Sequence, residues 1–456
     1  MKIFLNKCSR HAIYRTLFCM IFLSVSFFAC KKTEVPLSQN AESSSDLLLN
    51  KNASQFSSEV IDKWITMQLR LNRDAVGIPN VAFFRYCAYS GIAALESLTP
   101  GLPQKEVLSD KWNGLTGLPH TDGSKNYYWP ASVNTALASM NRNIFTTAST
   151  IDKAAIDSLE NALNDSYLLI KNTDVITKSN TFGQAVADAV FSWSQTDGYL
   201  HASDPYIAPT GPGLWVPTPP LFSPASTPYW GNNRTLVNGS TDNTQPGPPI
   251  AYSEDPNSDF YKMVKHVYNV SQNLTPADSA QALFWRDLPG VTAAGHWLSI
   301  LQQVLKQTNS TLDKAAFAYA LTGVCLNDAS ISCWQTKYHY NLVRPVTYIQ
   351  QVLGHTSWLP LLSTPAHPEY SSAHCVMSGA AAKALTAIFG DIGSFTDHTY
   401  DYLGYAPRTF SSFHDIGEDV AHARVLAGLH YRPSCDTGLI QGRKVTANIL
   451  QILNVH

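Results

Sequence analysis

The sequence predicts an all-α protein: helical bundles in two halves, each like a four-helix bundle, with one long ordered loop rich in proline and glycine. Apolar residues recur at three- and four-residue steps along most of the chain, which is the spacing of one face of an α-helix. Strand-like alternation of apolar and polar residues is sparse. The helical stretches have lengths typical of bundles, and no repeat of roughly 20–50 residues indicates a solenoid.

Periodicity begins at Val60 and indicates helices over about 60–71 and 83–95. Further helices are expected at about 130–145, 150–170, 181–197, 258–272, 275–286, 291–307, 313–335, 372–389, 415–428 and 436–453. Residues 203–256 are the exception, because proline and glycine interrupt any pattern there. The segment carries four large aromatic residues that need burial, so we expect it to wrap over the helices: Trp215, Phe222, Tyr229 and Trp230.

The composition excludes two classes of protein. The 456 residues include 32 Lys and Arg against 34 Asp and Glu, a formal net charge of −2, so the chain lacks the basic footprint of a nucleic-acid-binding protein. Hydrophobic residues make up 45 % and aromatic residues 11 % of the chain. That is ample for a large core and excludes wholesale disorder.

The N-terminal residues indicate export rather than fold. Basic residues precede a short apolar run at 17–28, as in a secretory signal. The run ends in Ala29-Cys30, which resembles the lipobox of bacterial lipoproteins. We therefore expect a signal peptide over 1–29, a lipidated Cys30, a flexible tether over 30–56 and one helical domain over 57–456. The protein would then be exported, as a periplasmic, outer-membrane or cell-surface lipoprotein of a bacterium, and would touch the membrane only through its lipid. A plain secretory signal or an uncleaved anchor is the alternative.

Five cysteines remain beyond the signal and the lipidation site: Cys87, Cys325, Cys333, Cys375 and Cys435. No CxxC pair occurs, which excludes a zinc ribbon and a thioredoxin-type site. An oxidising compartment would allow one or two disulfides plus a buried thiol, and the sequence leaves the pairing open.

Two cations and a proline form the first motif, Lys337 to Arg344-Pro345. Lys337 and Arg344 are seven residues apart, two helical turns, so we expect both side chains to project from one face. Pro345 would end the helix or turn the chain just beyond Arg344. Arginine offers a planar fork for tetrahedral oxyanions and lysine a compact charge.

The second motif is Ser371-Ser372-Ala373-His374, directly before a helix rich in small residues. Either serine is suited to cap that helix, whose free N–H groups would form an anion site. His374, in the first turn, would face the same anion.

The third motif contains Arg424, His430 and Asp436. Gly428 and Pro433 suggest that a helix ends near Gly428 and that His430 lies in the following turn. Asp436 is a downstream carboxylate able to orient the imidazole ring.

The order and spacing of these motifs, within about 325–442, resemble the vanadium-dependent haloperoxidase / PAP2 acid phosphatase superfamily. Its pattern is K-x6-RP, then PSGH, then SR-x5-H-x3-D. The chain departs from the pattern at Ala373 in place of Gly, at Ala423 in place of Ser, and at Asp436, which lies farther beyond the histidine. The residues flanking Lys337 and Ser372 favour the haloperoxidase side.

The resemblance implies roles for these residues. Lys337, Arg344, Arg424, Ser372 and the N–H of Ala373 would hold the oxyanion, vanadate or phosphate. His430 would bind vanadium axially, with Asp436 as its catalytic partner, and His374 would be the acid–base group. The leading function is a vanadate-dependent haloperoxidase that oxidises iodide or bromide with hydrogen peroxide to hypohalous acid, with a homodimer as a possible assembly. The alternative is a PAP2-type acid phosphatase that hydrolyses phosphomonoesters through a phosphohistidine on His430.

His367 lies five residues before Ser372. The resemblance suggests a histidine at this position in algal bromoperoxidases and a phenylalanine in chloroperoxidases. We therefore expect His367 to affect halide selectivity, with chloride oxidised poorly or not at all; the alternative is a loop residue on the rim of the site. His296 could line the pocket, although we favour its interpretation as a structural histidine.

Overall fold

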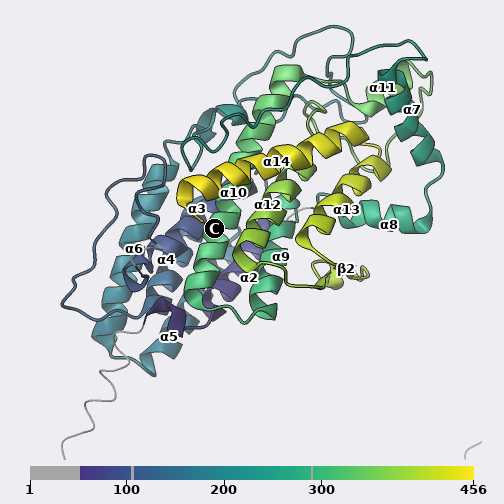
Figure 1. The fold of residues 1–456 in the computed structure, drawn as a ribbon. Coiled ribbons are helices and arrows are strands. Elements are labelled where there is room, and N and C mark those ends of the chain that lie inside the picture. The colour runs from purple at the N-terminus through teal and green to yellow at the C-terminus, as the bar shows by residue number, and fades with distance from the viewer. Residues whose placement is uncertain (1–51, 104–106, 289–290, 456) are drawn as a thin grey trace, which may run out of the picture. The chain divides into compact units, whose positions relative to one another are not determined.

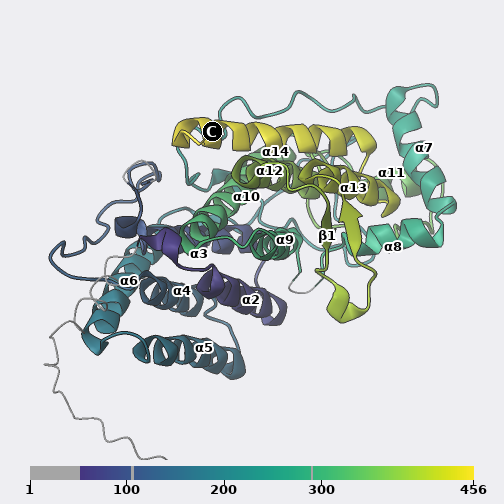
Figure 2. The same ribbon diagram turned by 60° about the horizontal axis from the view of Figure 1, so that its bottom comes forward.

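Two groups of helices dominate the computed structural model, which describes residues 52–103, 107–288 and 291–455 (Figure 1). The first group comprises α2 (Glu59–Asp74), α3 (Ala82–Glu96), α4 (Trp129–Ile144), α5 (Thr150–Leu168) and α6 (Thr173–Ser194). The second comprises α9 (Ala293–Gln307), α10 (Leu312–Tyr340), α12 (Ala373–Phe389), α13 (Phe413–Leu426) and α14 (Arg432–Leu453). Helix α3 packs along α10 and so joins the two groups. In Figure 2 the first group lies at lower left and the second group above it and to the right. One hydrophobic core runs through both groups. The predicted fold class is confirmed.

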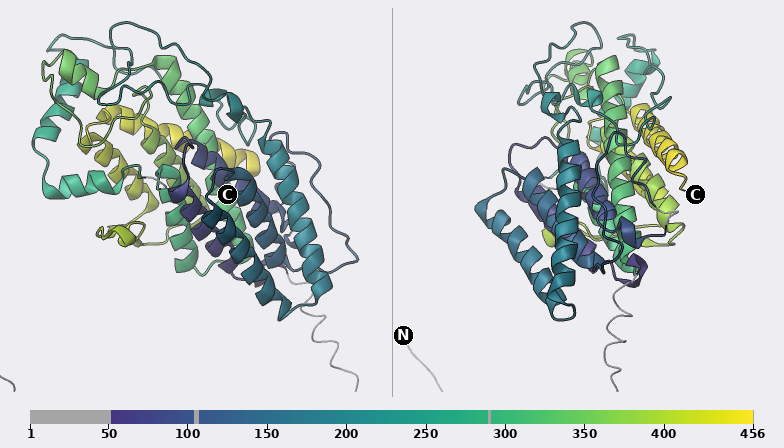
Figure 3. Two further views of the ribbon diagram at one scale, coloured as in Figure 1. Left: turned by 180° about the vertical axis from the view of Figure 1, so that it is seen from behind. Right: turned by 90° about the vertical axis from the view of Figure 1, so that its left-hand side faces the viewer.

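Three shorter helices lie together at one end of the second group (Figures 1 and 3): α7 (Asp259–Gln272), α8 (Pro276–Phe284) and α11 (Pro345–Gln351). A two-stranded antiparallel sheet pairs β1 (Phe395–Asp397) with β2 (Arg408–Phe410). Single 3-10 turns complete the secondary structure of the described ranges: η1 (Ala53–Gln55), η2 (Thr99–Gly101), η4 (Tyr199–His201), η5 (Trp230–Asn232) and η6 (Asp401–Leu403).

Side-chain caps explain the starts of several helices. Thr275 and Asp278 form a capping box at the start of α8, and the Ser412 hydroxyl accepts a hydrogen bond from the Asp415 N–H at the start of α13. Such caps satisfy backbone donors that have no partner within the helix. The predicted boundaries fail for α6, which starts at Thr173, and for α10, which continues to Tyr340. Helix α11 and the two strands were not predicted.

Helices α12 and α14 run parallel and nearly touch at their backbones. A side chain added at Gly442 would overlap the Val376 carbonyl, and one added at Gly379 would overlap Leu439. Thr446 donates a hydrogen bond to the Ala380 carbonyl at 3.0 Å across the same contact. Because both helices run in the same direction at this contact, both N-termini lie at the same end of the pair. This contact fixes the geometry of the site described below.

The proline- and glycine-rich segment 203–256 is anchored to α10, as predicted. Both oxygens of the buried Asp328 side chain accept hydrogen bonds from the segment, including one of 2.8 Å from the Leu236 N–H. Trp215 and Trp230 are 1 % and 0 % exposed. Phe222 corrects the prediction, because its side chain is 62 % exposed.

Three further observations bear on the sequence-based expectations. Within the described residues, no helix has the length and apolar character needed to cross a membrane. All five cysteines there are buried free thiols, so the structure shows none of the disulfides that an oxidising compartment would allow. The expected signal peptide over 1–29, Cys30 and all but the last residues of the tether lie outside the described ranges.

Candidate active site

Three cations and two histidines converge at the N-terminal ends of α12 and α14. Lys337 lies in the last turn of α10, Arg344 immediately precedes α11, and Arg424 lies in the last turn of α13. His430 occupies the connection between α13 and α14, and His374 lies in the first turn of α12. The structure therefore brings together residues from all three sequence motifs.

Lys337 and Arg344 reach the site from different elements. Helix α10 ends at Tyr340, and Asn341 adopts a left-handed conformation with φ 48°. Arg344 then caps α11, with Pro345 as its first residue. The prediction of one shared helical face is wrong, because Asn341 turns the chain between the two cations, although the side chains still converge.

Backbone carbonyls hold the first two cations. Lys337 Nζ donates hydrogen bonds to the carbonyls of Pro368 at 2.8 Å and Glu369 at 3.0 Å. Arg344 donates from Nε to the His367 carbonyl at 2.9 Å and from Nη1 to the Leu429 carbonyl at 3.1 Å. Burial lowers the pKa of Lys337 and lowers that of Arg344 to about 10. Both positive charges are thus incompletely compensated, a state that a bound anion would relieve.

Arg424 and Ser372 have polar atoms without partners. Arg424 is 2 % exposed and donates from Nη1 to the Trp285 carbonyl at 3.1 Å, whereas its Nε has no hydrogen-bond partner among the described residues. Ser372 is the N-cap of α12, as predicted, but its buried hydroxyl makes no capping bond and no other hydrogen bond of ordinary geometry within the described ranges. The N–H of Ala373, at the start of the helix, has no partner within α12. These donors fit an oxyanion.

Glu369 orients His430. His430 Nδ1 lies 2.8 Å from Glu369 Oε1, and the opposite ring nitrogen, Nε2, lies 3.2 Å from Arg344 Nη1. Arginine can only donate, so Nε2 is the acceptor and Nδ1–H donates to Glu369. Burial, together with Arg344, holds the pKa of His430 well below its usual value. The ring is therefore neutral, and its Nε2 lone pair accepts the hydrogen bond from Arg344, which a ligand bound at Nε2 would replace.

Asp436 does not approach the His430 ring, and the expected pairing is wrong. Its carboxylate pairs with Arg432 Nε at 2.7 Å and is 48 % exposed. Asp436 lies one turn into α14 and pairs with a residue of the same helix. Glu369, by contrast, reaches His430 from the segment before α12. Glu369 also accepts hydrogen bonds from the Tyr431 N–H at 3.1 Å and the Ser434 hydroxyl at 2.7 Å.

His374 is paired with a carboxylate that the sequence did not indicate. Its Nε2 lies 3.4 Å from Asp287 Oδ1, and Asp287 also accepts a hydrogen bond from the Ala293 N–H. Burial would raise the pKa of Asp287, but His374 and Arg424 outweigh it and lower the pKa to about 2. The pKa of His374 is lowered by burial and by Arg424, against the opposing effect of Asp287.

His367 lies in the same pocket rather than on an outer rim. Arg344 Nη2 donates to its Nδ1 at 3.0 Å, and its ring centroid lies 5.1 Å from that of Trp334. Burial and the charges of Lys337 and Arg344 hold the pKa of His367 well below its usual value. The ring therefore offers Nε2–H as a hydrogen-bond donor.

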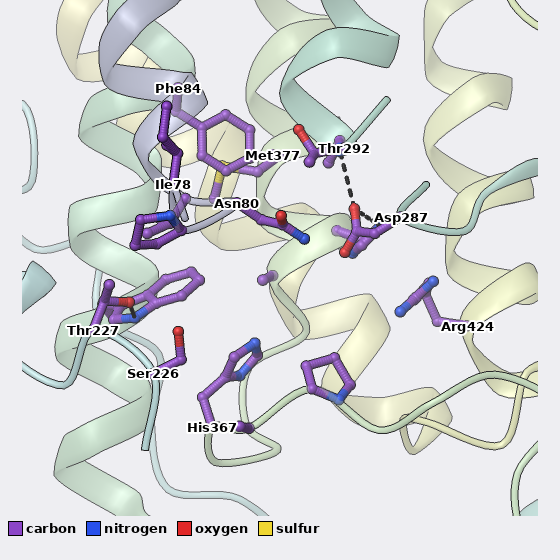
Figure 4. Close-up of a pocket in the computed structure, with 18 of the residues that line it drawn as sticks. Ile78, Asn80, Phe84, Ser226, Thr227, Asp287, Thr292, His367, Met377 and Arg424 are labelled. Atoms are coloured by element: carbon purple, nitrogen blue, oxygen red, sulfur yellow. Dashed lines mark hydrogen bonds and ion pairs between the residues drawn. The ribbon is translucent and has the colours of Figure 1, made fainter. Parts of the chain in front are cut away.

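His367, His374, Arg424 and His430, together with Asp287 and Ala373, line a cavity of about 350 Å³, the size of a small-ligand site. Figure 4 shows Asp287, His367 and Arg424 around one part of it, with Ile78, Phe84 and Met377 grouped in another. Ser226 and Thr227 of the long loop complete the lining. Of the residues that sequence reasoning missed, Glu369 stood beside the recognised motif, whereas Asp287 had no pattern around it.

Comparison with known proteins identifies the family. The family profile described as "VCPO second helical-bundle domain" matches residues 317–357 and 354–456. The solved structure titled "Crystal structure of the first bacterial vanadium dependant iodoperoxidase" superimposes with a TM-score of 0.79 at 33 % identity, covering 87 % of this chain and 96 % of that one.

Two more distant structures share the fold. They are the apo and holo forms of a bacterial vanadium-dependent chloroperoxidase, with TM-scores of 0.64 and 0.61 at 14 % and 16 % identity. The alignments cover 83 % and 82 % of this chain, and 95 % and 92 % of those chains. Comparison with curated protein sequences gave no match. Because a third of the aligned residues are identical to those of the iodoperoxidase over nearly the whole of both chains, the chain belongs to the vanadium-dependent haloperoxidases and is an enzyme of that kind.

Proposed function

We propose that the protein binds vanadate among Lys337, Arg344, Arg424, Ser372 and Ala373, which we call the cationic cradle. There it would oxidise iodide, and also bromide, with hydrogen peroxide to hypohalous acid. The observation that carries the proposal is the convergence of Lys337, Arg344 and Arg424 with a buried Ser372 hydroxyl that makes no hydrogen bond of ordinary geometry among the described residues. Three buried cations beside free donors are costly without an anion. The relative named an iodoperoxidase supports iodide as the halide.

The donor set fits a tetrahedral oxyanion with one nitrogen ligand. Lys337, Arg344 and Arg424 would neutralise its charge, while Ser372 and the Ala373 N–H would donate to its oxygens. His430, whose ring is oriented by Glu369, would bind the vanadium through Nε2. Bound vanadate would supply the activation of peroxide for halide oxidation.

Two further polar side chains would supply the proton and affect the choice of halide: His374 and His367. Halide oxidation by peroxide consumes one proton for each hypohalous acid formed. His374, which lies beside Asp287, would deliver it. His367 Nε2–H would donate a hydrogen bond on the open side of the cradle and so adjust which halides react.

One paired assay tests this function. The purified protein is assayed with and without orthovanadate for triiodide formation from iodide and peroxide, and for hydrolysis of p-nitrophenyl phosphate. We expect vanadate-dependent triiodide formation that is lost in His430→Ala. The control is His414→Ala, because His414 is 59 % exposed and outside the pocket. Phosphate ester hydrolysis without halide oxidation would instead support the phosphatase expected as the alternative.

A further inference from the structure

A second histidine–carboxylate pair lies behind His374. His296 Nε2 is 2.6 Å from Asp397 Oδ2, and the side chains are 4 % and 0 % exposed. The other oxygen of Asp397 accepts hydrogen bonds from the Thr399 hydroxyl at 2.6 Å and the Thr399 N–H at 2.9 Å. Burial would raise the pKa of Asp397, but His296 and Thr399 hold it below its usual value. The carboxylate is therefore charged and saturated with donors.

The environment of His296 suits a proton carrier. Its ring is stacked on Trp285, with centroids 4.3 Å apart and an interplanar angle of 20°. The indole face and the Asp397 carboxylate both stabilise an imidazolium. His296 Nδ1 makes no hydrogen bond to any described residue, so one ring nitrogen remains available.

A small cavity separates His296 from the active-site histidine. Its volume is about 10 Å³, and its lining includes His296, His374, Arg286, Thr292 and Ser378. That volume admits about one water molecule, which needs two to four polar partners. Two of the lining residues have buried polar atoms without partners among the described residues, Arg286 Nε and Thr292 Oγ1. Such orphaned groups are rare in folded proteins, and both belong to residues that line this cavity, although Thr292 also lines the larger active-site cavity.

We propose that this cavity holds one ordered water that links His374 to the His296–Asp397 pair, making His296 the residue that returns protons to His374. After His374 gives up its proton, the water donates one to it and takes one from His296 Nδ1, leaving His296 neutral and bonded to Asp397. His296 must then take up one proton from the solvent before the next turnover, so that each turnover draws in the one proton that hypohalous acid formation consumes. The relay rests on the proposed function, whereas the water site does not.

The water site is tested without activity. A crystal structure of the vanadate-free protein should show an ordered water within hydrogen-bond distance of a ring nitrogen of His296 and of His374. In Thr292→Val, which keeps the shape but removes one partner, the water should be weakly occupied or displaced. A dry cavity in the unmodified protein would overturn the proposal.

The relay is tested by kinetics with a matched control on the same helix. His296→Phe keeps an aromatic ring against Trp285 but cannot carry a proton. The control is Gln302→Leu, which loses hydrogen bonds of Gln302 to the Asp62 carbonyl and the Thr66 hydroxyl away from the cavity. We expect kcat for iodide oxidation to fall about tenfold or more in His296→Phe. KM for peroxide and Kd for vanadate should stay within about twofold, and kcat of the control should be unchanged.

The alternative outcomes are distinct. Equal kcat in His296→Phe and Gln302→Leu would overturn the relay, as would a loss explained by weaker vanadate binding. If His296→Phe fails to fold, Asp397→Asn keeps the volume and removes the charge, and its kcat decides in the same way. If the unmodified protein oxidises no halide with vanadate present, the proposed function fails and the relay fails with it, while the crystallographic water still decides the site.

Discussion

The imidazole of His430 is fixed by Glu369, whose Oε1 lies 2.8 Å from Nδ1. The carboxylate comes from the segment before α12 and the histidine from the turn before α14, so the bond ties together the two helices whose backbones nearly touch. Because Glu369 also accepts from the Tyr431 N–H and the Ser434 hydroxyl, it has a single position. The other ring nitrogen, Nε2, is thereby directed toward Arg344, one of the three cations of the cradle.

Replacing this carboxylate should weaken vanadate binding. Glu369→Gln keeps an acceptor for Nδ1–H but removes the charge that makes His430 a stronger ligand. We expect a loss of about tenfold or more in vanadate affinity, measured by titrating the vanadate-free enzyme. Asp436→Asn is the matched control and should bind as the unmodified protein does. Weaker vanadate binding in Asp436→Asn, with unchanged binding in Glu369→Gln, would show that Asp436 is the functional partner of His430.

The two site histidines should separate binding from turnover. His430→Ala should abolish vanadate binding, because it removes the only nitrogen ligand expected in the cradle. His374→Ala should keep binding and lose most of kcat, because His374 faces Asp287 rather than the ligand position. Calorimetric titration with vanadate and iodide oxidation rates measure the two quantities. Intact vanadate affinity in His430→Ala would show that His430 is not a ligand of the vanadate.

Replacing a buried cation should weaken vanadate binding, but it should not reduce the stability of the vanadate-free protein. Arg424→Met should weaken vanadate binding by about 3 kcal/mol, because the bound anion is left under-compensated. The same change should leave the vanadate-free protein as stable as before or more so, since one uncompensated charge is gone. Lys337→Met and Arg344→Met test the other two positions. Thermal unfolding with and without vanadate measures both effects, and unchanged vanadate affinity would place that cation outside the cradle.

Buried neutral histidines should make the vanadate-free protein sensitive to acid. The pKa values of His367 and His430 are held well below the usual value, whereas in the unfolded chain both take up protons near pH 6.5. The unfolded state then binds more protons, so the free energy of unfolding falls as pH drops below about 6.5, by up to about 1.4 kcal/mol per pH unit for each group. His367→Gln should reduce this slope in denaturant unfolding between pH 7.5 and 5. Trp334→Phe, which changes a neighbour that does not titrate, should leave it unaltered.

Halide selectivity should respond to His367. Replacement by phenylalanine removes the ring donor held in place by Arg344, so the ratio of bromide to iodide turnover and the pH optimum should both shift. Steady-state rates with each halide across a pH series measure these changes. Unchanged ratios together with an unchanged pH profile would show that His367 takes no part in halide oxidation.

The fold class and most residues of the site could be predicted from the sequence. The contacts between those residues and their carboxylate partners could not. Helical spacing is local information, which is why most helices were found within a few residues of their ends. The contact between Glu369 and His430 joins residues 61 positions apart, and no local pattern distinguishes Glu369 from Asp436 as the partner. Asp287 escaped notice for the same reason: only the fold brings it to His374. Asn341 shows the converse failure, since its left-handed turn interrupts what looked like one helix from Lys337 to Arg344.

A crystal structure of the protein with vanadate, using the anomalous signal of vanadium, tests the central claim most directly. We expect one vanadium peak in the cradle, at bonding distance from His430 Nε2, with Ser372 Oγ, Lys337, Arg344 and Arg424 donating hydrogen bonds to the surrounding oxygens. A peak at another place in the chain, or a vanadate that is not bonded to His430, would contradict the proposed site.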